Sequence, residues 1–339
     1  MTNQDTPLLA DAPSDDPASA TRQGALDVIT VGEAMALFIA EQPGPLAQVH
    51  SFRRATAGAE LNVAIGLRRL GLTVGYVSRL GRDSLGENLL ACMDAEGIDH
   101  QQLRIDDRHA TGFMFKSLEV DGRDPAIEYF RRGSAASHLG MADLPAAYCA
   151  ASRHLHLTGI SPALSQSSCE LVFKMARQAR AAGRSVSFDP NLRPQLWPSP
   201  TRMVEVINAL AGHADLVMPG LSEGRLLTGR DNPQAIAAYY LERGARQVVV
   251  KLGEQGAWFA DSTHSGRVAA VPVGRVVDTV GAGDGFAVGV ISALLEDLPL
   301  AEAVRRGSLI GARVVQFPGD CDGLPNRQQL DQDAAALRG

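Results

Sequence analysis

Short runs of β-branched and apolar residues alternate along this chain with longer stretches of helical character. The first run, residues 27–32, is a buried-strand signal that ends at Gly32. Strands that alternate with helices form a mostly parallel sheet whose two faces are covered by helices. We therefore predict an α/β fold with a three-layer α/β/α core. The expected strands cover residues 27–32, 73–78, 154–157, 185–188, 216–218 and 247–251, and the expected helices cover residues 59–70, 85–96, 168–182, 201–211 and 233–243.

Two stretches, residues 34–56 and 111–132, depart from this alternation. Both are strand-like, and neither is followed promptly by a helix. We predict that they form a small separate β-sheet, a lid over one end of the main sheet. Residues 26–330 should be one domain that includes these insertions. Residues 1–25, rich in Asp, Ala, Pro and Ser, should be a disordered extension, and residues 331–339 a C-terminal tail.

The composition limits the classes of partner. The chain has 339 residues, of which 45% are hydrophobic, and a formal net charge of −6. It has no Lys/Arg-rich run and no apolar run as long as a membrane span, so neither nucleic acid nor a membrane is an expected partner. The four cysteines form no Cys-x-x-Cys pair, which favours free thiols and a reducing, cytoplasmic location.

The segment Gly281-Ala282-Gly283-Asp284 gives the strongest indication of chemistry. It follows a strand-like run over residues 267–277 and opens an apolar helix expected over residues 282–295. Glycines let backbone N–H groups face a cavity, and a helix N-terminus adds donors and partial positive charge. These donors suit the anion of a phosphoryl transfer. We expect the helix dipole to keep Asp284 ionised as a weak base, and the alternative is an Asp that merely caps a helix.

This segment and a second one near the N-terminus resemble the signatures of the ribokinase-like (pfkB-type) carbohydrate kinases. The C-terminal signature is matched from Asp278 to Gly289. The N-terminal signature is matched by Ala57-Gly-Ala-Glu-Leu-Asn-Val-Ala64, Leu70-Gly71 and Gly81-Arg-Asp-Ser-Leu-Gly86. The resemblance runs over residues 27–325 and implies a sugar kinase that uses ATP and Mg²⁺. It also implies that Asp284 is the catalytic base and that the loop of Gly281, Ala282 and Gly283 holds the transferred phosphoryl group.

The resemblance implies a nucleotide side as well. The loop that begins at Lys251 matches the family loop that lines the ATP phosphates and base, and its alternative is an ordinary strand-to-hairpin turn. Ser308 stands where related kinases often carry an Asn that contacts the nucleotide. Asn191 lies at the carboxyl end of a strand, where sites of α/β proteins form. The candidate nucleotide contacts are Asn191, Arg193, Lys251, Gly253, Gly256, Gly281, Gly283 and Ser308.

A metal site is implied by one further stretch. The family usually carries Asn-x-x-Glu near its Mg²⁺ and phosphate site, and the matching stretch here is Gly220-Leu-Ser-Glu223. Gly220 replaces the Asn, but Mg²⁺ keeps several waters and takes few protein ligands. Glu223 is therefore a candidate Mg²⁺ ligand that acts through water, with a helix N-terminal Glu as the alternative. A requirement for a monovalent cation such as K⁺ stays open.

The sugar side has neutral and basic candidates. Gly58 and Asn62 match sugar-contacting positions of the family, although Asn62 could instead face solvent. Ribose-type members carry an Asp shortly after the first strand, whereas residues 32–38 here are largely apolar, which argues against ribose.

Two arginine segments favour an acidic sugar. The segments around Arg131 and Arg193, together with residues 155–165 and 318–323, resemble the pattern of 2-keto-3-deoxygluconate kinases of this family, which implies substrate contacts by Tyr129, Arg131, Arg193 and Asp320. Arginine matches a planar carboxylate bidentately. The alternatives are a surface position for Arg131 and a purely ATP-binding role for Arg193. Met114 lies in a Phe-Met-Phe stretch where a related kinase can place a Tyr, so a hydroxyl contact is expected to be missing.

The resulting hypothesis is ATP-dependent phosphorylation of 2-keto-3-deoxygluconate to its 6-phosphate. A fructokinase or another hexose kinase of the same fold is the first alternative, and a catalytically silent sugar- or nucleotide-sensing module is the second. In similar kinases lid strands commonly pair between subunits, because an exposed sheet face is costly. The resemblance therefore implies a homodimer or higher homo-oligomer through the lid.

Overall fold

The computed structural model describes residues 26–119 and 125–337, so the expected disordered extension over residues 1–25 lies outside it. In the described residues one large sheet has the strand order β13-β12-β11-β10-β9-β8-β1-β4-β5. Strands from β11 to β5 pair in parallel, whereas β12 and β13 add an antiparallel edge. The strands are β1 (Val28–Val31), β4 (Val74–Gly81), β5 (Leu103–Asp106), β8 (His154–Thr158), β9 (Ser185–Asp189), β10 (Leu216–Val217), β11 (Gln247–Lys251), β12 (Ala257–Asp261) and β13 (Ser265–Val268).

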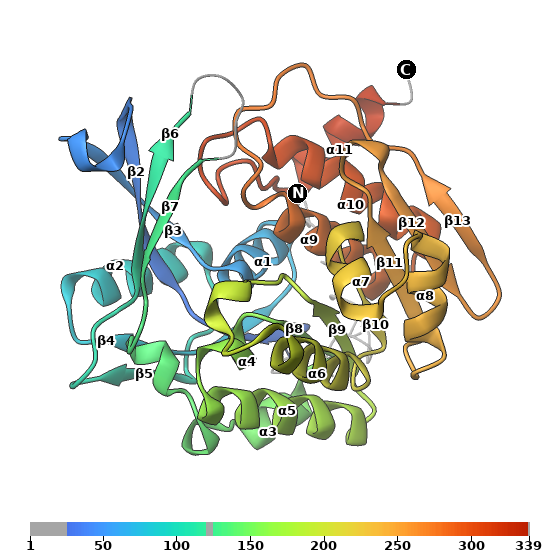
Figure 1. Ribbon diagram of the computed structural model, residues 1–339, viewed down its shortest axis with the longest axis horizontal. Helices are drawn as coiled ribbons and strands as arrows, with labels where there is room; N and C mark the ends of the chain where they lie inside the picture. The colour runs from blue at the N-terminus through green and yellow to red at the C-terminus, as the bar shows by residue number, and fades with distance from the viewer. Residues whose placement is uncertain (1–25, 120–124, 338–339) are drawn as a thin grey trace, which may run out of the picture.

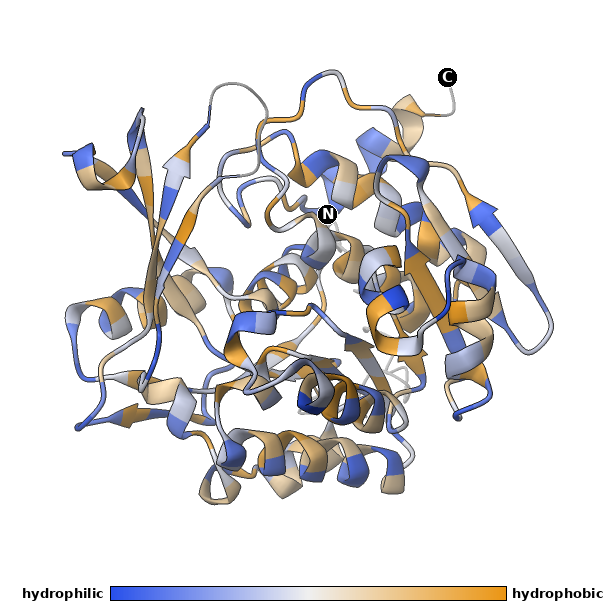
Figure 2. Ribbon diagram, in the orientation of Figure 1, coloured by the Kyte–Doolittle hydropathy of each residue, from blue (hydrophilic) through white to orange (hydrophobic). Residues whose placement is uncertain are grey.

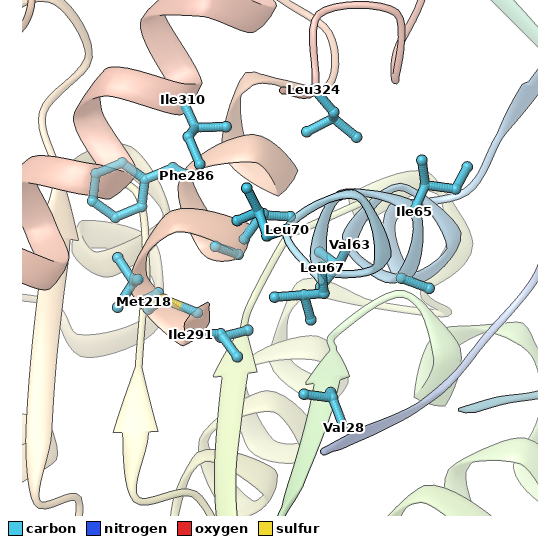
Figure 3. Packing of buried hydrophobic residues seen from close by; sticks show 14 of the residues in the cluster. Val28, Val63, Ile65, Leu67, Leu70, Met218, Phe286, Ile291, Ile310 and Leu324 are labelled. Carbon is cyan, nitrogen blue, oxygen red and sulfur yellow. The ribbon is translucent and has the colours of Figure 1, made fainter. Parts of the chain in front are cut away.

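Helices cover both faces of this sheet because successive strand residues point to opposite sides. In β11, Val249 packs into one apolar cluster and Val248 and Val250 pack into the other. The first cluster, drawn in part in Figure 3, includes α1 (Ala59–Arg69), α2 (Ser84–Glu96), α9 (Ala282–Leu295), α10 (Leu300–Val314) and α11 (Arg327–Ala336). The second includes α3 (Ala146–Ala151), α5 (Gln166–Ala181), α6 (Pro200–Ala211), α7 (Leu221–Thr228) and α8 (Pro233–Leu241). The predicted three-layer α/β/α core is thereby confirmed, and Figure 2 shows apolar residues concentrated on its strands.

Local side chains set the helix ends. The carboxylate of Asp83 accepts hydrogen bonds from the N–H groups of Leu85 and Gly86, which begins α2, and Gly97 ends it at a φ of 68°. Ser165 caps α5 in the same way through its hydroxyl. None of the helices that the structure describes is long and apolar enough to cross a membrane.

A second, smaller sheet stands apart from the large one, on the left of Figure 1. Its strand order is β3-β2-β6-β7, from β2 (Met35–Pro43), β3 (Phe52–Ala57), β6 (Phe113–Leu118) and β7 (Ile127–Phe130). One face carries a small apolar cluster that includes Leu37 and Met114. The predicted small β-sheet is confirmed. The division into domains stays a prediction.

Most element boundaries lie within a few residues of the expected ones, and two segments differ by more. The strand expected over residues 267–277 is wrong beyond Val268, because an irregular segment with Pro272 and Gly274 follows and leads to α9. The tail expected from residue 331 begins inside α11, whose Leu330 is buried in the core. A short helix that was not expected, α4 (Ser161–Leu164), follows β8.

Candidate active site

A cavity of about 450 Å³ lies between the small sheet, the carboxyl ends of β9 and β11, and the start of α9. Carboxyl ends of parallel strands are where α/β folds place ligand sites. The predicted site residues that line it are Gly58, Asn62, Tyr129, Arg131, Asn191, Arg193, Glu223, Lys251, Gly281, Gly283, Asp284 and Asp320. The structure does not place Ala282, Gly253, Gly256 or Ser308 among the residues that line this cavity.

The start of α9 is built around Gly281. This residue has a φ of 83°, and a Cβ there would collide with the carbonyl oxygen of Asp320, so only glycine fits. Gly283 follows in the first turn and also lines the cavity. The N–H of Ala282 lies 3.4 Å from the carbonyl oxygen of Thr279, so this amide faces the preceding turn. The helix start therefore presents Gly281 and Gly283 to the cavity.

Asp284 lies at the centre of the site. Its carboxylate accepts a hydrogen bond of 2.8 Å from the Asn62 amide and a longer one of 3.4 Å from the Asn191 amide. Burial, with the negative charges of Asp189 and Asp320, raises the pKa of Asp284 to about 7, although the Asn62 hydrogen bond opposes this shift. The expectation that the helix dipole keeps this carboxyl readily ionised is wrong, because desolvation outweighs the dipole.

Lys251 faces the same space from the end of β11. Its ammonium pairs with the carboxylate of Asp189 at 2.6 Å, and a Cβ on Gly283 would lie 3.6 Å from its Nζ. Although burial opposes the charge, Asp189, Glu223 and Asp284 raise the pKa of Lys251, so it carries a positive charge beside the start of α9. Sequence reasoning missed Asp189, and its signal was its position as the last residue of a parallel strand.

Two predicted nucleotide contacts, Gly253 and Gly256, have backbone roles outside the cavity lining, and a third, Ser308, is buried. Gly253 forms a tight turn after β11 with a φ of 58°. Gly256 has a φ of 89°, and a side chain there would collide with the backbone at Val268. The hydroxyl of Ser308 is buried within α10 and has no hydrogen-bond partner among the described residues.

Glu223 is held firmly by backbone groups. One carboxylate oxygen accepts from the N–H of Leu192 and the other from the N–H of Gly220, both at 2.7 Å. This is the helix N-terminal arrangement named above as the alternative to metal binding. Glu223 still lines the cavity. No group of three or more His, Cys, Asp or Glu side chains in the described residues could hold a metal ion by itself.

Gly58 and Asn62 stand at the beginning of α1. Gly58 has a φ of 132°, and a Cβ there would collide with the carbonyl oxygen of Glu33. Asn62 is buried, so the alternative of a solvent-facing Asn is wrong. Its Nδ2 binds Asp284, while its buried Oδ1 finds no hydrogen-bond partner in the described residues.

Arg131 is not the surface arginine that the alternative assumed. Only 7% of it is exposed, and its Nε and Nη2 donate to the carboxylate of Glu33 at 2.7 and 2.5 Å. Glu33 also accepts from the Ser134 hydroxyl. A buried guanidinium requires such a partner, but Glu33 was not predicted, since it stands in a stretch that is otherwise apolar. Tyr129 lies beside it, with the Arg131 guanidinium 5.7 Å from its ring centre.

Arg193 and Asp320 complete the cavity wall. Arg193 is half-buried, and its Nη1 donates to the carbonyl oxygens of Leu192, at 3.0 Å, and of Asn191, at 3.4 Å. Asp320 is buried and pairs at 2.9 Å with Lys116 of β6. Lys116 and its second partner Asp278 were not chosen from the sequence, because nothing local to either residue indicates a contact over such a separation.

Fold and site together define the class as a carbohydrate kinase. The family model described as pfkB family carbohydrate kinase matches residues 25–327, and the chain belongs to that family. A 2-dehydro-3-deoxygluconokinase of Bacillus subtilis (strain 168) is 48% identical over 314 residues, which cover 92% of this chain and 97% of the relative. A probable fructokinase-7 of Arabidopsis thaliana is 30% identical, over 94% of this chain and 95% of its own.

Solved structures agree with this assignment. The crystal structure of a PfkB protein from Polaromonas sp. JS666 is 55% identical, with a TM-score of 0.84 over 91% of this chain and 99% of the other. An E. coli protein assigned as a ribokinase II, solved in complex with ATP and Mg²⁺, is 26% identical, with a TM-score of 0.85 over 92% of this chain and 99% of its own.

Proposed function

We propose that this enzyme transfers the γ-phosphoryl group of ATP to the 6-hydroxyl of 2-keto-3-deoxygluconate. The observation that carries the proposal is one cavity that joins a helix start open to an anion, a buried carboxyl at Asp284 and two arginines. The resemblance to a 2-dehydro-3-deoxygluconokinase over most of both chains supports this substrate.

Each polar group of the cavity has a distinct role in this transfer. Asp284 takes the proton of the attacking hydroxyl as the new oxygen–phosphorus bond forms and the bond to the ADP oxygen breaks. The Gly281 and Gly283 backbone and the positive end of α9 stabilise the charge on the transferred group. Lys251, whose pKa is raised, adds positive charge beside them. Asn62 and Asn191 orient the Asp284 carboxylate.

The chain fits ATP and Mg²⁺ through charge rather than through a closed set of ligands. Glu223 lines the cavity and would hold the ion through water, because both its oxygens already accept backbone hydrogen bonds. When bound with ATP, Mg²⁺ neutralises phosphate charge. The relative from E. coli that was solved with ATP and Mg²⁺ supports this pairing.

The substrate carboxylate would meet the arginines. Within residues 26–119 and 125–337, the only hydrogen-bond partners of Arg193 are carbonyl oxygens, so its guanidinium is available to an anion in the cavity. Arg131 keeps Glu33 as a partner and contributes its remaining donors. Tyr129, Gly58 and Asp320 would complete the substrate side, since all three line the cavity.

A sugar panel tests the proposal. ADP release is measured with 2-keto-3-deoxygluconate, its galacto epimer, fructose and ribose, and kcat/KM should be highest for a keto-acid. An equal or higher kcat/KM on fructose would make the protein a fructokinase, and no ADP release with any sugar would indicate a silent sensing module.

Asp284→Asn should lower kcat about a hundredfold or more on every substrate, as expected for a lost general base. Near-normal turnover in that variant would contradict the role of Asp284.

We also propose that the small sheet joins two copies of the chain. Its face opposite the cavity carries a group of phenylalanines in ring contact, and Phe130 is 48% exposed. Phe113 and Phe130 stack at 4.8 Å, so the apolar surface is continuous. The group is Phe38, Phe52, Phe113, Phe115 and Phe130.

Light scattering after size exclusion checks this proposal. The wild-type mass should be at least twice the 35.9 kDa of one chain. Phe130→Glu should lower the mass toward one chain, whereas Leu226→Glu, a matched change at a residue of α7 that is 50% exposed, should not. A wild-type protein that is monomeric at micromolar concentration would contradict the proposal.

A cytoplasmic location agrees with the cysteines and with the proposed reaction. All four cysteines are free thiols, and the reaction consumes ATP. We propose this location on those two grounds, and fractionation of the producing cells tests it.

A further inference from the structure

Lys116 of β6 carries a buried charge that the proposed reaction does not use. Its side chain is 2% exposed, and its ammonium contacts the carboxylates of Asp278 and Asp320. The carbonyl oxygen of Pro318 lies 3.3 Å from the same nitrogen. The ammonium therefore joins a strand of the small sheet to two loops that are distant in sequence.

Both of these loops touch the start of α9. Asp278 stands three residues before Gly281, and its Oδ1 accepts from the Val280 N–H at 3.0 Å, which fixes the turn into the helix. On the other side, the backbone of Asp320 packs directly against Gly281. Lys116 thus clamps the two segments that hold the anion-binding glycines in place.

Stability alone is a weak reason for such a cluster. Buried ion pairs are often no more stabilising than apolar residues of similar volume, because both ions lose their hydration. Without the ammonium, two buried carboxylates would repel each other beside the place where phosphate charge must bind. A cation at this point is therefore needed for the charge balance of the site.

We propose that Lys116 is a positioning residue that serves as a tethered monovalent cation for the phosphoryl-binding loop. A free K⁺ ion in a dry site must replace its hydration shell with oxygen atoms of the protein. The buried anionic oxygens next to Gly281 already contact the Lys116 ammonium, so this place does not fit an added ion. The enzyme should consequently work without K⁺.

The first experiment uses the wild-type enzyme. ADP release is measured in potassium chloride and in tetramethylammonium chloride at equal ionic strength, and the two kcat values should agree within about twofold. A large loss in tetramethylammonium that added K⁺ restores would overturn the proposal. The assay uses whichever sugar of the panel is turned over fastest, because the inference depends on phosphoryl transfer and not on the identity of the sugar.

The second experiment makes the cation removable. Lys116→Met keeps most of the side-chain volume but loses the charge, and kcat should fall at least tenfold. Since the missing partner is a small cation, ammonium or potassium chloride at about 0.1 M should restore much of the loss, and tetramethylammonium should not. Lys116→Arg should retain activity without any such dependence. Lys174→Met, the same change on α5, is the matched control and should behave like the wild type.

Two results would contradict the proposal here. One is a Lys116→Met enzyme with wild-type kcat, and the other is a folded but impaired enzyme that no small cation restores, which would make Lys116 purely structural. If Lys116→Met does not fold, the wild-type salt comparison and Lys116→Arg still decide the question.

Discussion

At the scale of single residues, Asp284 shows how a site is set by opposing forces. Its place in the first turn of α9 favours the charged form, while burial and two neighbouring carboxylates favour the neutral form. The second influence is larger, and the pKa rises to about 7. A base with a pKa near the working pH is effective in proton transfer.

This pKa predicts an acid limb in the pH profile. Asp284 must be ionised to accept a proton, so kcat/KM should fall as the pH drops below about 7, approaching tenfold per pH unit. Initial rates from pH 5.5 to 8.5 measure the effect. The residual activity of Asp284→Asn should lack this limb, and an unchanged limb in the variant would assign it to another group.

The same shift predicts a gain in stability when the charge is removed. Because the folded pKa lies above the ordinary value of 3.8, the contribution of Asp284 to stability is greatest below about pH 4 and is lost as the pH rises to about 7. Asp284→Asn should therefore increase the free energy of unfolding at pH 8 by about 1–4 kcal/mol, and by less at pH 5. Urea titrations at both values check this. Asp106→Asn is the opposite control. Hydrogen bonds from the Arg108 N–H and from His109 lower the pKa of Asp106 to about 2, so loss of this carboxylate should destabilise the fold at pH 8.

At the scale of elements, α9 is fixed by close contact with its neighbour. A Cβ on Gly289 would lie 2.6 Å from the Cα of Gly307, so α9 and α10 touch backbone to backbone. Their contact keeps the beginning of α9 at the cavity. Phe286 of α9 and Ile310 of α10 belong to the apolar cluster drawn in part in Figure 3.

Gly289→Val tests this contact. The added side chain must separate the two helices, which should cost about 1–3 kcal/mol of unfolding free energy and lower kcat, because the glycine loop moves with α9. Thermal unfolding and ADP release measure both effects. Gly274→Ala, in a loop where a Cβ would meet nothing within 4 Å, is the control and should change neither. Equal stability of Gly289→Val and the wild type would contradict the packing argument.

At the scale of the whole molecule, two buried ion clusters join the small sheet to the body. Glu33, which follows β1, pairs with Arg131 beyond the end of β7, and Lys116 of β6 reaches the loops beside α9. Each cluster spans elements that no short stretch of sequence connects. The position of the small sheet over the cavity therefore depends on these pairs as well as on its apolar face.

Glu33→Ala should loosen this connection. It leaves the Arg131 guanidinium buried without a partner, which costs about 3–5 kcal/mol in similar cases. Amide exchange in β6 and β7 should also become faster. As a control, Asp107→Ala removes the ion-pair partner of Arg82 on the surface, where both side chains are 68% exposed. This change should lower the free energy of unfolding by less than about 1 kcal/mol. Similar losses for the two variants would contradict the importance of the buried pair.

Part of this protein is encoded locally and was predictable. The bounds of β11 and α9 agree with the sequence pattern, because apolar periodicity, glycine and cap residues act within a few positions. The glycine loop and Asp284 were found for the same reason, since their chemistry lies in consecutive residues. The irregular path over residues 269–277 was not predicted from the sequence. Pro272 has no backbone N–H group to donate to a neighbouring strand, so the strand propensity of its neighbours does not decide the structure there.

The sequence by itself therefore determined the α/β class, the segments of the small sheet and the glycine-rich start of α9. Only the tertiary structure decided that Arg131 pairs with Glu33, that Lys116 serves Asp278 and Asp320, and that the Asp284 pKa is raised. The physical reason is that propensity and periodicity act between near neighbours in the chain, whereas burial and charge pairing depend on neighbours in space.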